Sequence, residues 1–564
     1  MKATKRIFSV FLTCVLAFTM AFAMGLTASA ADYTITITKP EGDIDRTYEA
    51  YQIFKGNLSD STLSDIEWGT GINGAAFLTE LQTNTSFTSF KSCTDAKTVA
   101  EKLATFKDNS DGAVAFAKLA GNFLTTATGS AKATSSANGE IKVPAAGYYL
   151  LKDVTDVTKP HDALSLNILE VVKNVTVNPK ADHPTVDKKI GTDISSGAAA
   201  NTATIGDKVP FVIASKVPQM QGYTKYFFVL NDSMTAGLTY NKDVAIKIGT
   251  TTLATDAYEV TYDDKANTMK IVIKDFFKQY KNRAGEDIVV TYSATLNENA
   301  NLTKDGNTNT VKLTYSNNPN VDYTGDNEPD TTDPVGETPK HVTVTYSTKL
   351  QLTKVDGKDK SKLEGVEFQI TGTSIKTAVS EGHYFKQDAA GEYYQLKDGT
   401  FTKDAPTAET ESKYVSNSVK YAEVTDATEK TNMQKVTARG TTGADGVITF
   451  GGLGAGTYYI TELKTLGGYN LLTAPITVKI DATPGTTSCK WTAKVNGNEE
   501  TDVFDKDNNM VKLTVENNKG SDLPITGGIG TTIFYVIGGL LVCGAVVMAI
   551  TKKKLSVEDK ADRN

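Results

Sequence analysis

Alternating hydrophobic and polar positions predict mostly β-structure along this chain. Between residues 181 and 320, almost every apolar run is short, alternates with polar residues and ends at Gly, Asn or Asp, as strands and turns do. Residues 341–520 repeat this pattern around a polar, Tyr-rich insertion, residues 377–437, to which the sequence assigns no function. We therefore expect two all-β sandwich domains in tandem.

The segment 31–180 has strand-like alternation at both ends and helical spacing between them. Its apolar residues recur every three or four positions, which is the spacing of one helix face, at Val99, Leu103, Phe106, Phe116, Leu119 and Phe123. We expect this segment to form an N-terminal β-sandwich with inserted helices.

The acidic stretch 321–340 lies between the two all-β segments and contains Pro329, Pro334 and Pro339. Prolines stiffen a connecting segment, so this composition predicts a linker between domains. Three domains and a linker agree with the length of 564 residues, since one domain takes roughly 150.

Both ends of the chain carry targeting signals. Lys2, Lys5 and Arg6 precede an apolar run that ends in small residues, the pattern of a cleaved signal peptide, residues 1–30. Near the other end, residues 529–550 are uncharged, mostly apolar and followed by lysines, which predicts a membrane-spanning helix. The protein is therefore expected to leave the cytoplasm.

Five residues stand just before this predicted span: Leu523, Pro524, Ile525, Thr526 and Gly527. The order of pentapeptide, apolar span and basic end resembles the LPXTG-type cell-wall sorting signal of Gram-positive surface proteins, here residues 523–564. The resemblance implies that a sortase cysteine attacks the Thr526 carbonyl, releases the chain from Gly527 onward and passes the acyl group to an amine. The alternative is a permanent membrane anchor with a chance pentapeptide.

Charge, histidine and cysteine use exclude several classes of function. The net charge is -7 and no long Lys/Arg run occurs in the interior, so nucleic acid is not an expected partner. The four histidines lack metal-ligand or nucleophile spacing, so we predict no metal, no cofactor and no enzyme. The cysteines outside the predicted targeting segments are Cys93 and Cys489, and they form no disulfide framework.

Strand periodicity places three polar residues of the C-terminal β segment on inward faces. Residues i and i+2 of a strand share a face, so Lys354 lies with Leu350 and Leu352. Glu462 and Asn517 are in phase with apolar neighbours in the same way. An unpaired charge on such a face is costly, so these residues are expected to meet.

The middle β segment repeats this order of Lys, acid and Asn. The residues in phase with apolar neighbours are Lys188, Asp232 and Asn317. A register error of one residue exchanges the two faces of a strand and would select Lys189 or Asn318 instead. The sequence thus predicts the same triad twice.

A buried amine, acid and carboxamide can react with one another. Burial lowers the pKa of a Lys and raises that of a carboxyl group, so a neutral amine can attack the Asn carbonyl while the protonated acid polarises it. Ammonia leaves, and a neutral isopeptide bond remains. The alternative for each residue is a Lys reaching solvent, an exposed acid and an Asn at a strand end.

Several segments resemble the sortase-assembled backbone pilins, the major shaft subunits of Gram-positive pili. They are Tyr48–Phe54, Leu352–Asp356, Leu363–Phe368 and Tyr458–Tyr469, the last resembling the E box of that family. The resemblance covers the whole chain. It implies tandem immunoglobulin-like domains of the collagen-adhesin A and B types, with Lys–Asn isopeptide bonds whose formation Asp232 and Glu462 promote.

Val175–Lys180 resembles the pilin motif, whose Lys is the amine that a pilin sortase joins to the next subunit. The resemblance implies a bond from Thr526 of one subunit to Lys180 of another, in a pilus that supports adhesion and colonisation. The implied partners are pilin-specific and housekeeping sortases, identical subunits, tip or minor pilins, peptidoglycan and a host or matrix ligand. The implied location is the cell wall and a surface pilus. A monomeric wall-anchored adhesin is the alternative, and it would not need Lys180.

Overall fold

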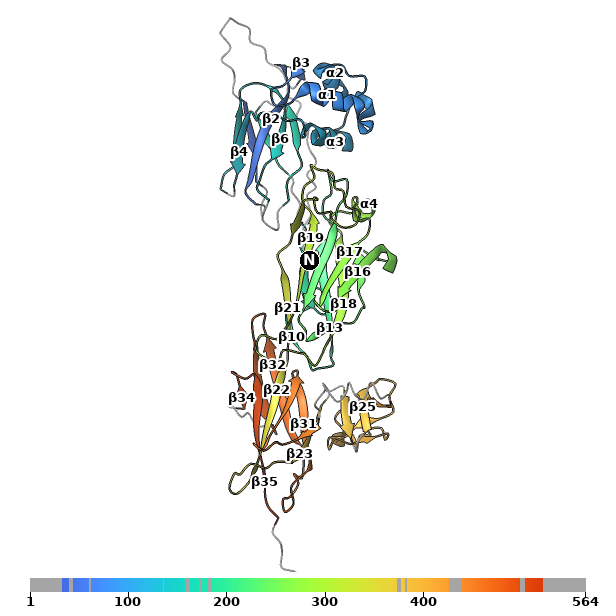
Figure 1. Ribbon diagram of the computed structural model, residues 1–564, viewed down its shortest axis with the longest axis vertical. Helices are drawn as coiled ribbons and strands as arrows, with labels where there is room; N and C mark the ends of the chain where they lie inside the picture. Colours follow the sequence, from blue (N-terminus) through green and yellow to red (C-terminus); the bar gives the residue numbers. More distant parts are fainter. Residues whose placement is uncertain are drawn as a thin grey trace, which may run out of the picture. The chain divides into compact units, whose positions relative to one another are not determined.

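The computed structural model describes residues 33–39, 44–59, 62–134, 136–157, 163–171, 174–179, 184–372, 377–380, 383–425, 439–497 and 503–520 (Figure 1). These residues form two compact units. Unit 1 contains the described residues up to 199 together with 209–294 and 308–344. Unit 2 contains 200–208, 295–307 and the described residues from 345 onward. Both units are mainly β-structure, as the sequence predicts.

The N-terminal part of unit 1 combines two sheets with a group of helices. One sheet has the order β5-β1-β8, and the other has the order β3-β2-β6-β7 with β4 also paired to β2. The strands are β1 (Tyr33–Ile37), β2 (Arg46–Ser59), β3 (Thr62–Trp68), β4 (Gly129–Ala133), β5 (Gly139–Val143), β6 (Gly147–Asp153), β7 (Ile168–Val171) and β8 (Val175–Val177). The helices are α1 (Gly74–Thr83), η1 (Thr85–Phe90), α2 (Ala96–Leu103) and α3 (Asp111–Ala120).

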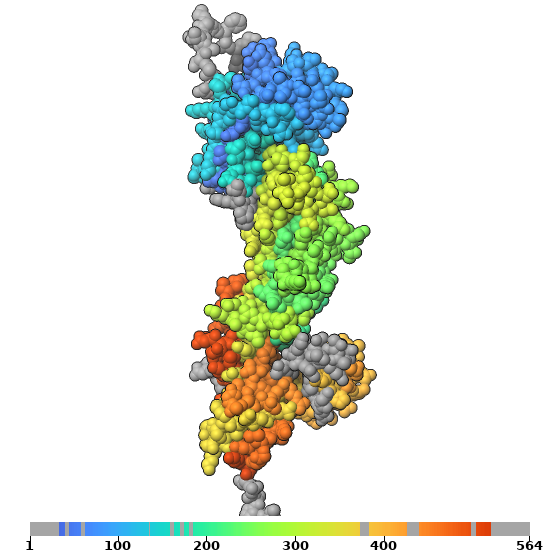
Figure 2. Space-filling model, in the orientation of Figure 1, coloured from blue at the N-terminus to red at the C-terminus, as the bar shows by residue number. Residues whose placement is uncertain are grey.

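The inserted helices predicted from the sequence are confirmed between β3 and β4. Each of α1, α2 and α3 begins at a polar residue, respectively Asn73, Asp95 and Ser110, whose side chain accepts a backbone N–H of the first turn, which stabilises a helix start. The apolar faces pack into one core around Phe77, Phe90, Val99, Leu103 and Phe116. Figure 2 shows these helices, in blue, at the surface of the N-terminal part.

The second part of unit 1, which we call the middle sandwich, contains two facing sheets. One has the order β15-β14-β18-β11-β9 with β13 paired to β18, and the other includes β21-β19-β12-β17-β16 with β20 paired to β19. The strands are β9 (Asp187–Ile190), β11 (Lys208–Lys216), β12 (Phe228–Met234), β13 (Leu238–Tyr240), β14 (Ala245–Ile248), β15 (Thr251–Thr252), β16 (Tyr258–Asp263), β17 (Thr268–Ile273), β18 (Asp287–Leu296), β19 (Asn307–Ser316), β20 (Val335–Glu337) and β21 (His341–Tyr346). Two short helices, η2 (Thr255–Ala257) and α4 (Phe276–Tyr280), connect strands.

Residues 321–340 are part of the middle sandwich, so the predicted linker is wrong. Within this stretch, β20 pairs with β19, and the Asp333 carboxylate accepts backbone N–H groups of Thr324, Gly325 and Asp330 at 2.8–2.9 Å. β21 then adds a further strand to the same sheet. Proline and acidic composition predicts an extended backbone, but it does not reveal that part of this backbone pairs with β19.

Unit 2 contains the C-terminal sandwich and the predicted insertion. Its sheets have the orders β30-β22-β35-β34 and β29-β23-β31-β32-β33. The strands are β22 (Thr348–Asp356), β23 (Glu367–Gly372), β29 (Arg439–Thr441), β30 (Val447–Leu453), β31 (Gly456–Lys464), β32 (Ile476–Pro484), β33 (Cys489–Val495), β34 (Phe504–Asp505) and β35 (Met510–Asn517), and β10 (Ala200–Thr202) also belongs to this unit.

The described residues of the insertion form a small lobe that carries β25 in Figure 1. It contains the sheet β24-β25-β28 and the pair β26-β27. Its elements are β24 (Thr377–Ser380), β25 (His383–Gln387), β26 (Tyr394–Gln395), β27 (Phe401–Thr402), η3 (Glu411–Lys413) and β28 (Tyr421–Val424). Phe385 and Phe401 stack with ring centroids 4.0 Å apart, so the lobe has a small aromatic core of its own.

The two predicted targeting segments lie outside the described residues. These are the signal peptide, residues 1–30, and the sorting signal, residues 523–564. Among the residues that are described, no helix has the length and apolar character needed to span a membrane.

Candidate cross-linking sites

The structure brings together Lys354, Glu462 and Asn517 inside the C-terminal sandwich. β22 and β35 run parallel with Lys354 opposite Val515, so Asn517 lies two residues further along the same face. Glu462 comes from β31 in the facing sheet. The Nζ atom of Lys354 lies 2.5 Å from Oδ1 of Asn517 and 3.4 Å from Oε1 of Glu462. The side chains of Lys354 and Glu462 are fully buried.

The Asn517 amide is held with its oxygen toward the amine. Its Nδ2 donates to Oε1 of Glu462 and to Oγ1 of Thr465, each at 2.7 Å. The other Glu462 oxygen accepts the backbone N–H of Leu472 at 2.9 Å. Burial, more than the neighbouring carboxylate, sets the pKa of Lys354 and lowers it from the ordinary value. The amine is thus favoured in its neutral, nucleophilic form beside a fixed amide carbonyl.

A second cluster lies inside the middle sandwich around Lys188 in β9. The Lys188 amine donates to Oδ2 of Asp232 and to Oδ1 of Asn309, and to the Tyr292 hydroxyl at 2.7 Å. Asp232 and Asn309 lie on neighbouring strands β12 and β19, while Tyr292 lies on β18 beside β11. The side chains of Lys188 and Asp232 are fully buried. This cluster therefore joins the two sheets of the sandwich.

The predicted pairing of Lys188 with Asn317 is wrong, because Asn309 occupies that place. Asp232 pairs with Val311 on β19, two residues from Asn309 and six from Asn317. At about 3.4 Å per residue, Asn317 lies about 20 Å along the chain from Val311, the residue opposite Asp232. Asn309 and Asn317 follow the same alternation, so the predicted face of this segment agrees with the structure and the predicted position along it does not.

Asn317 has a different role at the end of β19. It is buried, and its backbone carbonyl accepts the N–H of Leu164 at 2.8 Å. Its contacts therefore join the middle sandwich to the N-terminal part of unit 1. Of the two candidate lysines in β9, Lys188 is buried and Lys189 is partly exposed, which agrees with the predicted register of that strand.

Burial dominates the electrostatics of the middle cluster. It lowers the pKa of Lys188 to about 8 and raises the pKa of Asp232. It also raises the pKa of Tyr292 well above the ordinary value, so the phenol keeps its proton. The Oδ1 atom of Asp232 is buried and has no hydrogen-bond partner among the residues that the structure describes. An unpartnered carboxyl oxygen away from water favours the neutral acid.

Three residues of these clusters are not predicted from the sequence: Asn309, Tyr292 and Thr465. Asn309 and Asn317 both alternate in phase with the apolar residues of β19, so alternation alone does not show which of them faces Lys188. Tyr292 alternates with its neighbours like an ordinary core residue. Thr465 follows the end of β31, where strand periodicity carries no information about side-chain direction.

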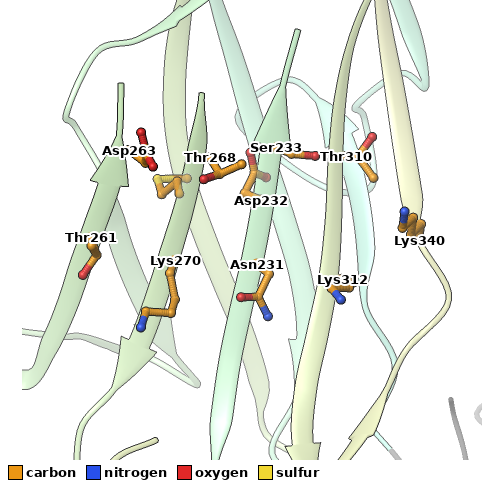
Figure 3. Close-up of a pocket in the computed structure, with 11 residues that line it drawn as sticks. Asn231, Asp232, Ser233, Thr261, Asp263, Thr268, Lys270, Thr310, Lys312 and Lys340 are labelled. Carbon is orange, nitrogen blue, oxygen red and sulfur yellow. The ribbon is translucent and has the colours of Figure 1, made fainter. Parts of the chain in front are cut away.

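A polar groove of about 400 Å³ lies on the outer face of the middle sandwich, behind the cluster (Figure 3). Lys270, Asn231 and Lys312 form one cross-strand row there. The two lysines form ion pairs with Glu328 and Glu337, each at 2.6 Å. The positive charges of the two groove lysines are therefore balanced by glutamates of the same chain. Nowhere in the described ranges do three or more His, Cys, Asp or Glu residues gather as a metal site.

Lys180, the predicted acceptor of the intersubunit bond, lies outside the described residues, as do Leu523, Pro524, Ile525, Thr526 and Gly527. The described part of the pilin-like motif contains β8, which pairs in parallel with β1. Pro179 is the last described residue before Lys180 and is buried.

Two sequence families match the two sandwiches that hold the clusters. Residues 205–319 match the family described as Gram-positive pilin backbone subunit 2, Cna-B-like domain. The chain is similar to Gram-positive backbone pilins. Residues 348–495 match a second family, the SpaA prealbumin-like fold domain. The resemblance expected from the sequence is therefore confirmed, and so is the fold class of repeated immunoglobulin-like, prealbumin-type domains.

Individual pilins show the same similarity. The trypsin-resistant surface T6 protein of Streptococcus pyogenes serotype M6 is 25% identical over 395 residues, which are 66% of this chain and 70% of that protein. The solved T6 backbone pilin of that serotype has a TM-score of 0.50 at 16% identity, over 88% of this chain and all of that chain. The full-length major pilin SpaD of Corynebacterium diphtheriae has a TM-score of 0.46 at 16% identity, over 88% and 99% of the two chains. These relatives are structural pilin subunits rather than enzymes.

Proposed function

We propose that this chain is the shaft subunit of a covalently polymerised pilus on a Gram-positive cell surface. The observation that carries the proposal is the recurrence of one buried chemistry, a Lys amine against an Asn amide beside a carboxyl group, in two successive sandwiches. The similarity to backbone pilins along most of the chain supports it.

In each sandwich the amine forms an isopeptide bond with the amide. The nitrogen of Lys188 or Lys354 attacks the side-chain carbonyl of Asn309 or Asn517, the acid transfers protons, and ammonia leaves. The reactions need no further component, because each cluster contains the nucleophile, the electrophile and the proton carrier. Asp232 serves as the acid in the middle sandwich and Glu462 in the C-terminal sandwich.

The bonds suit a protein that is pulled along its length. They link residues 121 and 163 positions apart, and in the chain-entropy model each closure stabilises the folded state by about 5 kcal/mol. A native domain is held by only about 5–15 kcal/mol in total. Each cross-link therefore adds a large fraction of a sandwich's stability.

Between subunits, a pilin sortase joins Thr526 of one chain to Lys180 of the next. A housekeeping sortase then attaches the finished polymer to peptidoglycan, and tip or minor pilins and a host or matrix ligand complete the set of partners. The similarity to the pilin motif and the sorting signal supports these assignments. The precursor is bound to the membrane only until the sortase cleaves it.

The test is a wall extract from cells that express the chain with its sortase. The wild-type protein should give a ladder of multimers that resists heat and detergent, and Lys180→Ala should remove the ladder. Lys142→Ala, at an exposed position of β5, is the matched control and should keep it. A ladder that persists in Lys180→Ala would refute the acceptor assignment. Monomers alone in the wild type would favour the wall-anchored adhesin.

A further inference from the structure

The two clusters differ in how the acid reaches the nitrogen that must leave as ammonia. In the C-terminal sandwich, Oε1 of Glu462 accepts directly from Nδ2 of Asn517 at 2.7 Å. In the middle sandwich, the side-chain partners of Asn309 are Lys188 and Tyr292, and Asp232 is not among them. The carboxyl group of Asp232 therefore makes no hydrogen bond to the leaving nitrogen.

The Tyr292 hydroxyl fills this gap. It donates to Oδ2 of Asp232 at 2.7 Å and accepts from Nδ2 of Asn309 at 2.9 Å. It also accepts from Nζ of Lys188 at 2.7 Å. One oxygen thus contacts the nucleophile, the acid and the leaving group. The ring is held in place, since it stacks on Phe211 with centroids 5.4 Å apart.

We propose that Tyr292 is a catalytic residue that relays a proton from Asp232 to the leaving nitrogen of Asn309. This proposal rests on the proposed isopeptide bond in the middle sandwich. It adds a fourth participant to the Lys, Asp and Asn of that site. The C-terminal sandwich has no need of such a relay, because Glu462 touches the amide nitrogen itself.

The relay balances in protons and electrons. The Lys188 lone pair forms a bond to Cγ of Asn309, and the amide nitrogen regains a lone pair as the carbon becomes tetrahedral. Tyr292 then turns from acceptor to donor and gives its proton to this nitrogen while it receives one from Asp232. The Cγ–Nδ2 bond breaks and ammonia leaves. The Asp232 carboxylate takes the surplus proton from the Lys188 nitrogen, with which it is in contact, so both Asp232 and Tyr292 end unchanged.

The chemical state of the tyrosine agrees with this role. A phenol that ionised at neutral pH would have no proton to pass on, whereas burial keeps Tyr292 protonated. Proton transfer by a positioned side chain typically contributes about 10²–10⁴-fold to a rate. Loss of the hydroxyl should therefore slow the reaction by at least about 100-fold.

The experiment follows cross-linking in Tyr292→Phe, which keeps the ring and removes the hydroxyl. The full chain is made by cell-free synthesis, and digested samples are taken over time. Mass spectrometry measures the fraction of the Lys188 peptide joined to the Asn309 peptide. The Lys354–Asn517 link in the same molecules is the internal reference. Tyr240→Phe is the matched control, because the Tyr240 ring packs 6.1 Å from that of Tyr292 but lies outside the cluster.

The expected result is a slower Lys188–Asn309 link in Tyr292→Phe, with the reference link and the Tyr240→Phe control at wild-type rates. A wild-type rate in Tyr292→Phe would overturn the relay and leave the proposed function intact. A wild-type chain that never forms the Lys188–Asn309 link would instead overturn the proposed bond itself.

A second measurement covers the case in which Tyr292→Phe does not fold. Replacing Tyr292 with 3-fluorotyrosine keeps the shape and the hydroxyl but makes the phenol more acidic, so a relay should change its rate. An unchanged rate would show that the hydroxyl only fills space, and would overturn the proposal.

Discussion

The Lys354 nitrogen lies 2.5 Å from the side-chain oxygen of Asn517, on a neighbouring strand of the same sheet. Lys188 and Asn309, in contrast, meet across the space between two sheets. The proposed bonds would therefore join two strands within one sheet of the C-terminal sandwich, β22 and β35, and would link one sheet to the other in the middle sandwich.

Replacing Glu462 with Gln should abolish the Lys354–Asn517 bond. Gln has nearly the same shape as Glu but carries no acidic proton, so the amide would lose its proton donor. The free energy of unfolding of unit 2 should fall by about 5 kcal/mol, the value of the lost closure, as measured by denaturant titration. Glu364→Gln, at an exposed position, is the control and should behave as wild type. Full cross-linking in Glu462→Gln would contradict the assigned role.

Substitution of Asn309 and of Asn317 should have different effects on mass. Asn309→Ala removes the amide that contacts Lys188, so the chain should lose one fewer ammonia, a difference of about 17 Da beyond the substitution itself. Asn317→Ala should keep the cross-link, because Asn317 follows the end of β19 and lies about 27 Å along the chain from Asn309. Intact-mass spectrometry of both variants decides this. The reverse outcome would restore the pairing that the sequence predicts.

Cross-linking in the middle sandwich should slow above about pH 8. The reactive form holds one proton between Lys188 and Asp232, with a neutral amine and a protonated acid. The pKa of Lys188 is lowered to about 8, so the pair loses this proton at higher pH and the rate should fall about tenfold per pH unit. Below the raised pKa of Asp232, a second proton occupies the amine and the rate should fall again. A rate that climbs steadily to pH 10 would instead indicate an amine that reacts like an exposed Lys.

Acid should weaken unit 2 through Asp356. Its carboxylate accepts the Tyr469 hydroxyl and the Lys358 N–H, both at 2.7 Å. The hydrogen bond from Tyr469 is the largest cause that lowers the pKa of Asp356 to about 2. Because the folded pKa lies below the unfolded value of about 4, this contribution is complete above pH 4 and is lost as pH falls toward 2. Denaturation midpoints measured from pH 6 to pH 2 should fall less in Asp356→Asn than in wild type. Equal slopes would show that the carboxylate does not contribute.

Sequence periodicity predicts the faces of strands well and positions along them poorly. The inserted helices are evident from Val99 and Leu103 in α2 and Phe116 in α3, because apolar residues recur every three or four positions in each helix. Lys354, Glu462 and Asn517 are found because each is the one Lys, acid or Asn, respectively, that alternation places on the inward face of β22, β31 or β35. Asn309 lies in β19 and Asn317 follows its last residue in the same alternation, and only the pairing of β19 with β12 selects between them.

Hydrophobic periodicity does not predict contacts with residues of another strand or of a loop. Tyr292 joins the middle cluster because β18 lies near β9 in the folded sheet, and Thr465 joins the other from beyond the end of β31. Residues 321–340 look like a connector by composition, yet Val335–Glu337 within them pair with β19. In each case the missing information is which segments meet.

The intact mass of the mature chain tests the central claim most directly. Each Lys–Asn bond releases one ammonia, about 17 Da. Two bonds, Lys188–Asn309 and Lys354–Asn517, should leave the protein about 34 Da lighter than its sequence requires. A mass equal to that of the unmodified sequence would contradict the account, because the two buried clusters would then be unreacted.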